Sequence, residues 1–457
     1  MVHTYSMNGL NVAVDGNSGG IHILDNTAYE LLAQCKNDFV FESAAAPLRD
    51  KYTEADLSEA WDEINSLKTK GLLFSPELEQ GVLNNAGLAN GIKALCLHVA
   101  HDCNLRCEYC FAAKGNYSMA NKLMPLEVAV QAVDFLLNNS GGRKNVEIDF
   151  FGGEPLLNFD VVKKTVEYGR KAGDRIGKEI HFTITTNGML LDDDKINYIN
   201  ENMNNVVISL DGRKEVHDSI RYAANGWGTY DAILEQALNF VRQRGNKSYF
   251  IRGTFTARNL DFSKDILHLA DLGFGEISME PVVGAGEDFH LRKEHIPAIL
   301  AEYERLAFAY ITRIKEGKPF RFYHFNVNIY DGPCLYKRVA ACGAGTEYFA
   351  VTPEGDLYPC HHLVGLPQFK AGDLDTGIVA DFLPASFREA NIFTKDECRK
   401  CWAKLFCSGG CHANSYYANG DIMRPEKSVC EMQQKRIECA IMIEAYKALF
   451  LGKEEES

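Results

Sequence analysis

The 457-residue sequence lacks the features that would place it in a membrane or on nucleic acid. Its first residues lack the basic and apolar blocks of a signal peptide, and no apolar run approaches membrane-spanning length. It also lacks a basic excess, since 62 acidic residues outnumber 48 basic ones and the formal net charge is -14. Such a charge disfavours binding to nucleic acid or anionic lipid. We therefore expect a cytoplasmic protein with no nucleic-acid and no membrane partner.

Fourteen cysteines are the most unusual part of the composition. A cytoplasmic chain keeps its thiols reduced, so metal ligation is a better interpretation than a disulfide framework. Cys103, Cys107 and Cys110 form a C-x-x-x-C-x-x-C trio with no fourth cysteine beside it, and nine more cysteines follow residue 333. The distribution predicts two separate metal-binding stations.

Between these stations, short β-branched or apolar runs alternate with longer helical patterns. Six such runs, from ALCLHV at 94–99 to EISMEPVV at 276–283, are each followed by a helix candidate such as PLEVAVQAVDFLLNN. Six consecutive βα units predict an α/β fold with a parallel sheet, either doubly wound or curled toward a barrel. Chemistry is then expected on the loops that follow the strands.

Four motifs occupy those loops. The cysteine trio follows the first run, GGEP at 152–155 the second and TNG at 186–188 the third, while SLDG at 209–212 ends the fourth. Because the carboxyl ends of parallel strands meet at one edge, all four motifs are expected on one rim.

The first 85 residues follow a different pattern, with the strand-like runs NVAVDG and GIHILD before two helical stretches. We interpret them as a module of winged helix-turn-helix type. Residues 1–90 carry thirteen acidic and five basic residues, whereas a DNA-binding module needs a basic face. A peptide is therefore the expected partner.

Three thiolates in one tight loop suit a tetrahedral metal or three irons of a 4Fe-4S cluster, with one position left open for a substrate. A structural zinc, completed by His101 or a later cysteine, is the alternative. It does not explain GGEP on the next loop.

The trio after the first strand, with Gly-Gly-Glu after the second, resembles the radical S-adenosylmethionine (SAM) superfamily. The resemblance implies a partial (β/α)6 TIM-like barrel in which Cys103, Cys107 and Cys110 bind three irons and act as the catalytic cysteines. The amino and carboxylate groups of S-adenosyl-L-methionine would bind the fourth iron. One electron would then cleave SAM to methionine and a 5'-deoxyadenosyl radical.

Other residues on the rim are candidates for binding SAM. Gly152 and Gly153 would let the backbone approach the methionine ammonium, and Glu154 would accept a hydrogen bond from it. The remaining candidates are Tyr109 for adenine, Asn187 for ribose, Ser209 for carboxylate or ribose, and Arg221 and Arg252 for carboxylate. Tyr109 could equally be an ordinary half-buried aromatic residue, Asn187 part of a turn, and either arginine a member of a structural ion pair.

The second station contains Cys342, Cys360, Cys398, Cys401, Cys407, Cys411 and Cys430. Two zinc sites are the plain alternative, but the pattern resembles the SPASM extension of radical SAM proteins, including its YFAVTPEGDLYPCHHL hairpin. The resemblance implies two auxiliary 4Fe-4S clusters. The inner cluster would use Cys342, Cys360 and Cys411, and the outer cluster would use Cys398, Cys401, Cys407 and Cys430. Cys334 would either complete the inner cluster or leave an open iron there. Cys35, Cys96 and Cys439 are interpreted as core residues.

The whole chain resembles peptide maturases of ribosomally made natural products (RiPPs), in particular those of six-cysteines-in-forty-five (SCIFF) precursors, which form thioether (sactionine) crosslinks. The implied domains are a leader-peptide recognition element at 1–85, a radical SAM core at 90–318 and a SPASM domain at 319–457. The implied partners are a Cys-rich precursor peptide, bound through its leader, and a reducing electron donor such as ferredoxin or flavodoxin.

The implied reaction removes a hydrogen from an acceptor residue of the peptide and joins that carbon to a cysteine sulfur. Two other functions stay open. One is a SPASM-type protein oxidase that makes formylglycine, although such enzymes generally lack the N-terminal module. The other is an iron-sulfur electron carrier or zinc-ribbon interaction protein without SAM chemistry.

Overall fold

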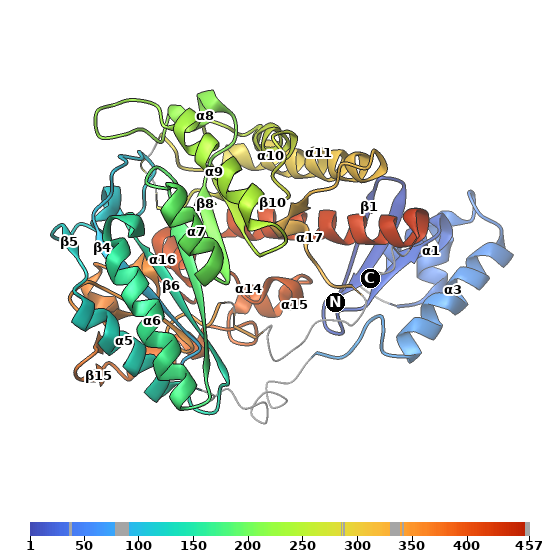
Figure 1. The fold of residues 1–457 in the computed structure, drawn as a ribbon. Helices are drawn as coiled ribbons and strands as arrows, with labels where there is room; N and C mark the ends of the chain where they lie inside the picture. The colour runs from blue at the N-terminus through green and yellow to red at the C-terminus, as the bar shows by residue number, and fades with distance from the viewer. Residues whose placement is uncertain are drawn as a thin grey trace.

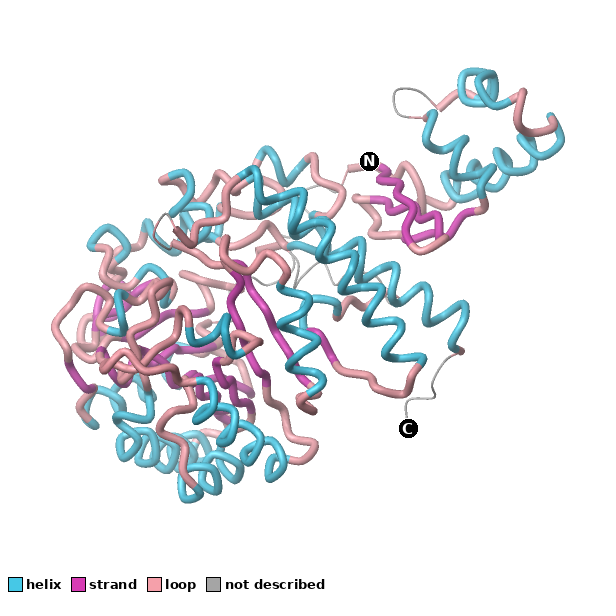
Figure 2. The backbone as a smooth tube through the Cα atoms, turned by 90° about the horizontal axis from the view of Figure 1, so that it is seen from above, coloured by secondary structure: helices cyan, strands magenta, loops and turns pink. Residues whose placement is uncertain are grey.

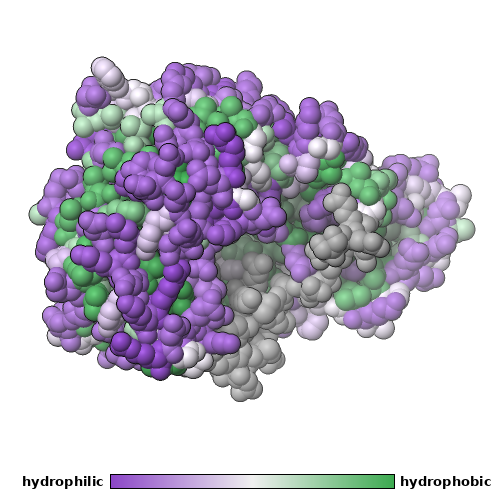
Figure 3. Space-filling view, in the orientation of Figure 1, coloured by the Kyte–Doolittle hydropathy of each residue, from purple (hydrophilic) through white to green (hydrophobic). Residues whose placement is uncertain are grey.

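The computed structural model describes residues 1–35, 39–77, 91–284, 286, 288–329, 339–340 and 342–452. Within them, a 12-stranded sheet forms the centre of the molecule and a 3-stranded sheet forms the N-terminal module (Figure 1). No helix in this described part is long and apolar enough to cross a membrane. Hydrophilic residues cover most of the face in Figure 3, with hydrophobic patches between them.

Six parallel strands form the main part of the large sheet. In spatial order they are β10 (Glu276–Pro281), β9 (Phe250–Phe255), β8 (Asn205–Ser209), β7 (Glu179–Thr186), β6 (Asn145–Gly152) and β4 (Ala94–His101). The main helices between and after them are α5 (Leu126–Asn139), α6 (Phe159–Arg175), α7 (Asp193–Asn202), α9 (Tyr230–Arg244), α10 (Phe262–Asp271) and α11 (Ile296–Lys315). The six predicted strands and the predicted α/β fold with a parallel sheet are confirmed.

The two faces of the sheet differ in polarity. On β6, Val146, Ile148 and Phe150 are fully buried, whereas Asp149 and Phe151 alternate with them and point to the other face. The register pairs Cys96 with Asp149 and His98 with Phe151, so these residues share that second face. This second face of the sheet therefore carries titratable groups.

The C-terminal part continues the same sheet. β12 (Tyr348–Val351) pairs in parallel with β4, and β13 (Asp356–Tyr358) returns from it as the predicted hairpin. β14 (Gly372–Asp373) and β15 (Gly377–Ile378) follow, while β11 (Arg321–Phe322) borders β10 and β5 (Lys122–Leu123) pairs with β4. The shorter helices are α8 (Lys214–Asp218), α13 (Phe382–Glu389), α14 (Asp396–Arg399), α15 (Lys404–Cys407) and α16 (His412–Asn419). The long helix α17 (Lys427–Tyr446) packs along α11 (Figure 2).

The N-terminal module consists of β1 (Val2–Met7), β2 (Leu10–Asp15), β3 (Ile21–Leu24), α1 (Asn26–Gln34), α2 (Phe41–Ala45) and α3 (Glu54–Thr69). Thr53 and Asp56 form a capping box that starts α3. β1 was not among the predicted strands, because VHTYSM mixes polar and apolar residues without a clear alternation. Its partner β2 matches the predicted run NVAVDG.

The small sheet is attached to the rest of the molecule through β1 and β2. Tyr5 and Val12 belong to the main hydrophobic core, whereas Ala13 on the opposite face packs with α1 and α3. The His3 ring stacks on Trp402 at 4.1 Å, and its Nε2 lies 2.8 Å from Glu438 Oε1. The predicted domain limits stay predictions, and the limit between 85 and 90 falls in 78–90, outside the described residues.

Candidate functional site

The cysteine trio lies on the loop that follows β4. The Cys103 backbone N–H donates to Asp102 Oδ1 at 2.8 Å, and the Leu105 N–H donates to Cys103 Sγ at 3.4 Å. Asn187 Nδ2, after β7, lies 3.6 Å from Cys103 Sγ, and Arg221 Nη1 lies 3.9 Å from Cys107 Sγ. N–H donors from three segments therefore point at two of the three sulfurs.

Glycines let the β6 loop approach this loop closely. A Cβ added to Gly153 would lie 2.1 Å from the Asp102 carbonyl oxygen, and one added to Gly152 would lie 2.2 Å from that of Ala100. Gly115 faces Cys103 in the same way, with φ of +106° and 2.6 Å from an added Cβ to Cys103 Cβ. The GGEP motif thus holds the trio's loop against the end of β6.

Glu154 is fully buried between β6 and β7. One carboxylate oxygen accepts from the Thr186 hydroxyl at 2.7 Å and the Leu156 N–H at 3.0 Å, and the other accepts from the Asn187 N–H at 2.8 Å. Burial raises the pKa of Glu154 to about 7, although these donors oppose the rise. Its predicted role as acceptor for the methionine ammonium stays a prediction.

Tyr109 and Arg221 meet at Asp211, a buried aspartate of the SLDG motif that was not a predicted site residue. The Tyr109 hydroxyl donates to Asp211 Oδ2 at 2.6 Å, and Arg221 Nε lies 3.0 Å from the same oxygen. Burial alone would lower the pKa of Arg221, but Asp211 and its neighbours keep it well above the usual value. Arg221 therefore stays charged beside Cys107.

Ser209 and Arg252 lie side by side on β8 and β9, where the register pairs them. Desolvation works against the ionised form of Glu280, whose side chain is 32% exposed near the end of β10, but the charges of His324, Arg436 and Arg252 lower its pKa to about 2. Burial, together with the charge of Arg252, lowers the pKa of His361 to about 3. Arg252 is thus grouped with Glu280, His324 and His361, and its predicted role in binding SAM stays a prediction.

The later cysteines gather in two groups. Burial, then the charges of Cys342 and Cys411, raises the pKa of Cys360, which makes these three thiols electrostatic neighbours. Burial and the charges of Cys407, Cys398 and Cys401 raise the pKa of Cys430 to about 12. We call the first set the inner group (Cys342, Cys360, Cys411) and the second the outer group (Cys398, Cys401, Cys407, Cys430).

A buried lysine accompanies the outer group. Lys395 is 1% exposed, and its Nζ donates to the Gly409 carbonyl oxygen at 3.0 Å. Burial lowers its pKa, while the charges of the neighbouring thiols raise it. A buried cation needs a counter-charge, and an anionic cluster held by these cysteines would supply one.

The remaining cysteines have other surroundings. Cys96 and Cys439 are buried in the main core and Cys35 in the core of the N-terminal module, which agrees with the interpretation as core residues. Cys334 lies outside the described residues.

The surroundings of the trio suit an iron-sulfur cluster. Among the described residues, no three or more His, Cys, Asp or Glu side chains are gathered as one metal ion would require. A 4Fe-4S cluster spreads its ligands more widely, because each cysteine binds its own iron. N–H groups directed at sulfur are also what such clusters use, since they stabilise the thiolate charge.

Comparison with known proteins identifies the central part of the chain. Residues 97–252, from β4 into β9, match the family model of the radical SAM superfamily. This part of the chain is a radical SAM domain. This match agrees with the predicted resemblance over these residues, whereas the binding of SAM and of a 4Fe-4S cluster by this chain stays a prediction.

Similarity extends beyond the radical SAM domain. The radical SAM cyclopropyl synthase TigE of Paramaledivibacter caminithermalis is 23% identical over 96% of this chain and 93% of its own length. A cysteine-type anaerobic sulfatase-maturating enzyme of Clostridium novyi is 25% identical over 68% of this chain and 86% of its own length. The crystal structure of Streptococcus suis SuiB bound to precursor peptide SuiA covers 94% of this chain and 98% of its own, with a TM-score of 0.52 and 16% identity. The last comparison concerns the fold alone.

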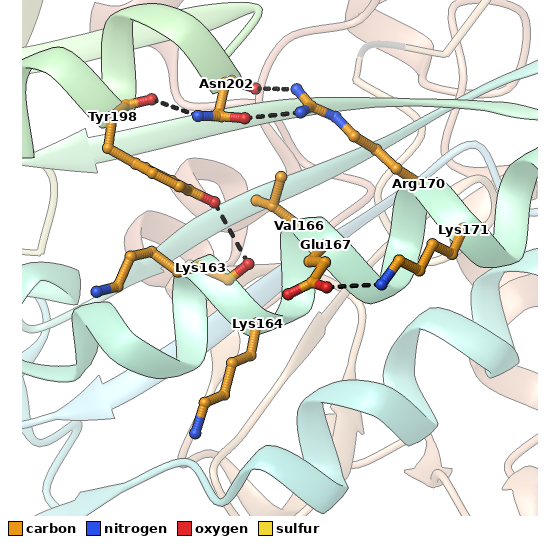
Figure 4. Close-up of a pocket in the computed structure, with 8 residues that line it drawn as sticks. All are labelled: Lys163, Lys164, Val166, Glu167, Arg170, Lys171, Tyr198 and Asn202. Carbon is orange, nitrogen blue, oxygen red and sulfur yellow. Dashed lines mark hydrogen bonds and ion pairs between the residues drawn. The ribbon is translucent and has the colours of Figure 1, made fainter.

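A surface hollow lies elsewhere, between α6 and α7. It measures about 500 Å³ and is lined by Lys163, Lys164, Val166, Glu167, Arg170, Lys171, Tyr198 and Asn202 (Figure 4). Lys171 pairs with Glu167 at 2.6 Å, and Arg170 Nη1 donates to Asn202 Oδ1 at 2.6 Å. These pairs account for Glu167, Arg170, Lys171 and Asn202, while Lys163 pairs with Asp160 at 2.8 Å.

Proposed function

We propose that the protein is a radical SAM peptide maturase that joins a carbon of a precursor peptide to a cysteine sulfur of the same peptide. The observation that carries this proposal is the grouping of ten cysteines into the trio, the inner group and the outer group. The relation to TigE over nearly the whole chain and the fold shared with peptide-bound SuiB support it.

In this proposal Cys103, Cys107 and Cys110 hold the cluster that binds SAM, and the inner and outer groups hold two auxiliary 4Fe-4S clusters. When bound, the first cluster and SAM would supply the 5'-deoxyadenosyl radical. Asn187, Arg221 and the Leu105 N–H orient and stabilise the thiolates. Cys334, next to the inner group in sequence, is either a further ligand or leaves a site for the peptide thiol.

The crosslinking reaction balances in atoms and electrons. The peptide gives one hydrogen atom from carbon to the deoxyadenosyl radical, and its thiol loses one proton. One electron leaves as the carbon–sulfur bond forms, and the inner group's cluster would accept it. The peptide thus loses two hydrogens for each thioether, whereas deoxyadenosine and methionine are the products of SAM.

We further propose that the N-terminal module binds the leader of a Cys-rich precursor peptide by strand addition. β1 contacts Glu438 and Trp402 of the C-terminal part, so β3 is the edge left for a peptide strand. We also propose a cytoplasmic location, with ferredoxin or flavodoxin as electron donor, because cluster chemistry needs a reducing compartment.

A formylglycine-forming protein oxidase is the second candidate, favoured by the similarity to sulfatase-maturating enzymes over two thirds of the chain. That similarity leaves about a third of this chain uncovered, whereas the similarity to TigE covers 96% of it, which favours the first candidate.

The separate roles of the two stations give a test. The anaerobically reconstituted wild type should contain about twelve irons, four for each cluster. Replacing Cys103, Cys107 and Cys110 together by Ala should remove about four irons and abolish deoxyadenosine. Cys360→Ala should leave deoxyadenosine formation intact and abolish the crosslink. SAM cleavage by the triple variant, or crosslinking at a normal rate by Cys360→Ala, would refute the proposal.

A further inference from the structure

The loop of the trio and the loop of the inner group touch through aromatic rings. Phe111 follows Cys110, and His362 lies two residues after Cys360. Their ring centroids are 3.9 Å apart with an angle of 35° between the rings. Through this ring contact, the chain next to Cys110 of the trio touches the chain next to Cys360 of the inner group.

The His362 ring packs against Phe111, and one of its two nitrogens makes no hydrogen bond. Its Nδ1 is buried without a hydrogen-bond partner, while its backbone carbonyl accepts from the Tyr417 hydroxyl at 2.6 Å. Burial and the charge of His361 keep its pKa well below the usual value, so the ring is neutral. A buried, unpartnered nitrogen is costly, so a purely structural position would favour an apolar ring.

Neighbouring rings continue the contact on both sides. The His361 ring lies 4.5 Å from that of His362, and His361 Nδ1 lies 4.0 Å from Cys360 Sγ. Tyr117 lies on the trio's side, and its pKa is raised by burial and by the charges of Cys96, Cys110, Cys360 and Cys103. The loops also approach where Gly365 meets the Tyr117 carbonyl oxygen, 2.6 Å from an added Cβ.

We propose that Phe111 and His362 form the path along which an electron passes between the inner group's cluster and the trio's cluster. The proposal rests on the proposed function, because it requires both cysteine groups to hold clusters. Electron tunnelling weakens steeply across empty gaps, and the tilted rings of Phe111 and His362, with centroids 3.9 Å apart, leave no gap at this junction.

The electron in question comes from crosslinking. Forming the carbon–sulfur bond releases one electron to the inner group, and reductive cleavage of the next SAM consumes one electron at the trio. Passing it along Phe111 and His362 oxidises the inner cluster and reduces the first one. The peptide is the electron source, so an external donor is needed only to begin the cycle.

The test uses reconstituted holoenzyme given less than one electron per protein by rapid mixing with dithionite. Freeze-quench EPR then follows how the electron redistributes between clusters. Phe111→Leu, a similar volume without a ring, should lose the fast phase of redistribution while iron content and both midpoint potentials stay at wild-type values. His362→Phe keeps a ring and should retain the fast phase, whereas His362→Leu should lose it.

Phe393→Leu is the matched control, because Phe393 packs beside Cys398 of the outer group and away from this junction. It should keep the fast phase. Redistribution at the wild-type rate in Phe111→Leu, or equal slowing in Phe393→Leu, would overturn the inference. If the reconstituted wild type holds fewer clusters than the three proposed, the proposed function is contradicted instead. The two failures are therefore distinguishable.

Discussion

Asp211 is the residue on which the surroundings of Cys107 depend most. It is fully buried and accepts from Tyr109, Arg221 and the Thr254 N–H. Sequence inspection assigned Tyr109 and Arg221 to SAM but did not assign their common acceptor, because an aspartate in a turn motif has many ordinary uses. Only the approach of the loops at 109, 211 and 221 reveals the network.

Asp211→Asn should lower stability strongly, because it leaves Arg221 charged and nearly buried without a counter-charge. Breaking such a pair costs about 3–5 kcal/mol. Differential scanning calorimetry of the holoenzyme measures the resulting fall in melting temperature. Asp231→Asn is the control, since Asp231 pairs with Lys214 at the surface and such pairs contribute less than about 1 kcal/mol. Equal falls in the two variants would contradict the role of Asp211.

Asp149, on the same face of the sheet as Cys96, gives a prediction about pH. Burial and the charge of Glu147 raise its pKa to about 6, against about 3.9 in the unfolded chain. The folded state therefore holds the carboxyl proton of Asp149 more tightly than the unfolded chain does. The free energy of unfolding consequently falls as the pH rises from about 3.9 to about 6.

Asp149→Asn removes that loss, so its melting temperature relative to wild type should rise from pH 4 to pH 6 and level off above about pH 6. The exposed Asp194→Asn serves as control and should show no such trend. A constant difference between Asp149→Asn and wild type across this range would show that Asp149 ionises as in water.

Among the secondary-structure elements, the six parallel strands were the most predictable. Runs such as VEIDFF carry both an apolar face and β-branched or aromatic residues, so their pattern alone indicates a strand. β1 was missed because its residues are divided between the main core, reached by Tyr5, and polar contacts such as that of His3 with Glu438. Those contacts are made by residues more than 400 positions apart, which no local pattern encodes.

A substitution at the end of β6 tests whether the close approach of its loop positions the trio. Gly153→Ala should push the trio's loop away, because its Cβ would meet the Asp102 carbonyl oxygen at 2.1 Å and that of Gly115 at 2.8 Å. We expect loss of about four irons and of deoxyadenosine formation, measured by iron analysis and chromatography. Gly142→Ala adds the same methyl group where nothing lies within 4 Å. If Gly153→Ala retains full iron and activity, the close approach of the two loops is not needed.

For the whole molecule, the attachment of the N-terminal module to the outer cysteine region is the main finding that sequence patterns missed. His3 stacks on Trp402, which follows Cys401, and Asn17 accepts from Lys404 Nζ at 2.7 Å. The proposed leader-binding module is therefore held by the segment that carries two outer cysteines. The strand-addition proposal places the leader at the opposite edge, on β3.

His3→Ala should loosen this attachment, because it removes both the stack on Trp402 and the contact with Glu438. Hydrogen–deuterium exchange should become faster in β1 and in α17 around Glu438, while the barrel strands stay protected. His22→Ala is the control, since the His22 ring lies against the Leu72 carbonyl oxygen, at 3.2 Å, within the module itself. Unchanged exchange of β1 in His3→Ala would show that Tyr5 and Val12 suffice for docking.

Mass spectrometry of a Cys-rich precursor peptide tests the central claim most directly. The peptide is incubated with reconstituted protein, SAM and a reductant, and its intact mass is compared with that of peptide treated with the Cys360→Ala variant. We predict that the wild type removes two hydrogens per crosslink with all sulfur retained, and that Cys360→Ala leaves the mass unchanged while still forming deoxyadenosine. Loss of sulfur from the peptide would indicate formylglycine formation, and deoxyadenosine formation by the wild type with no change in peptide mass would contradict crosslinking altogether.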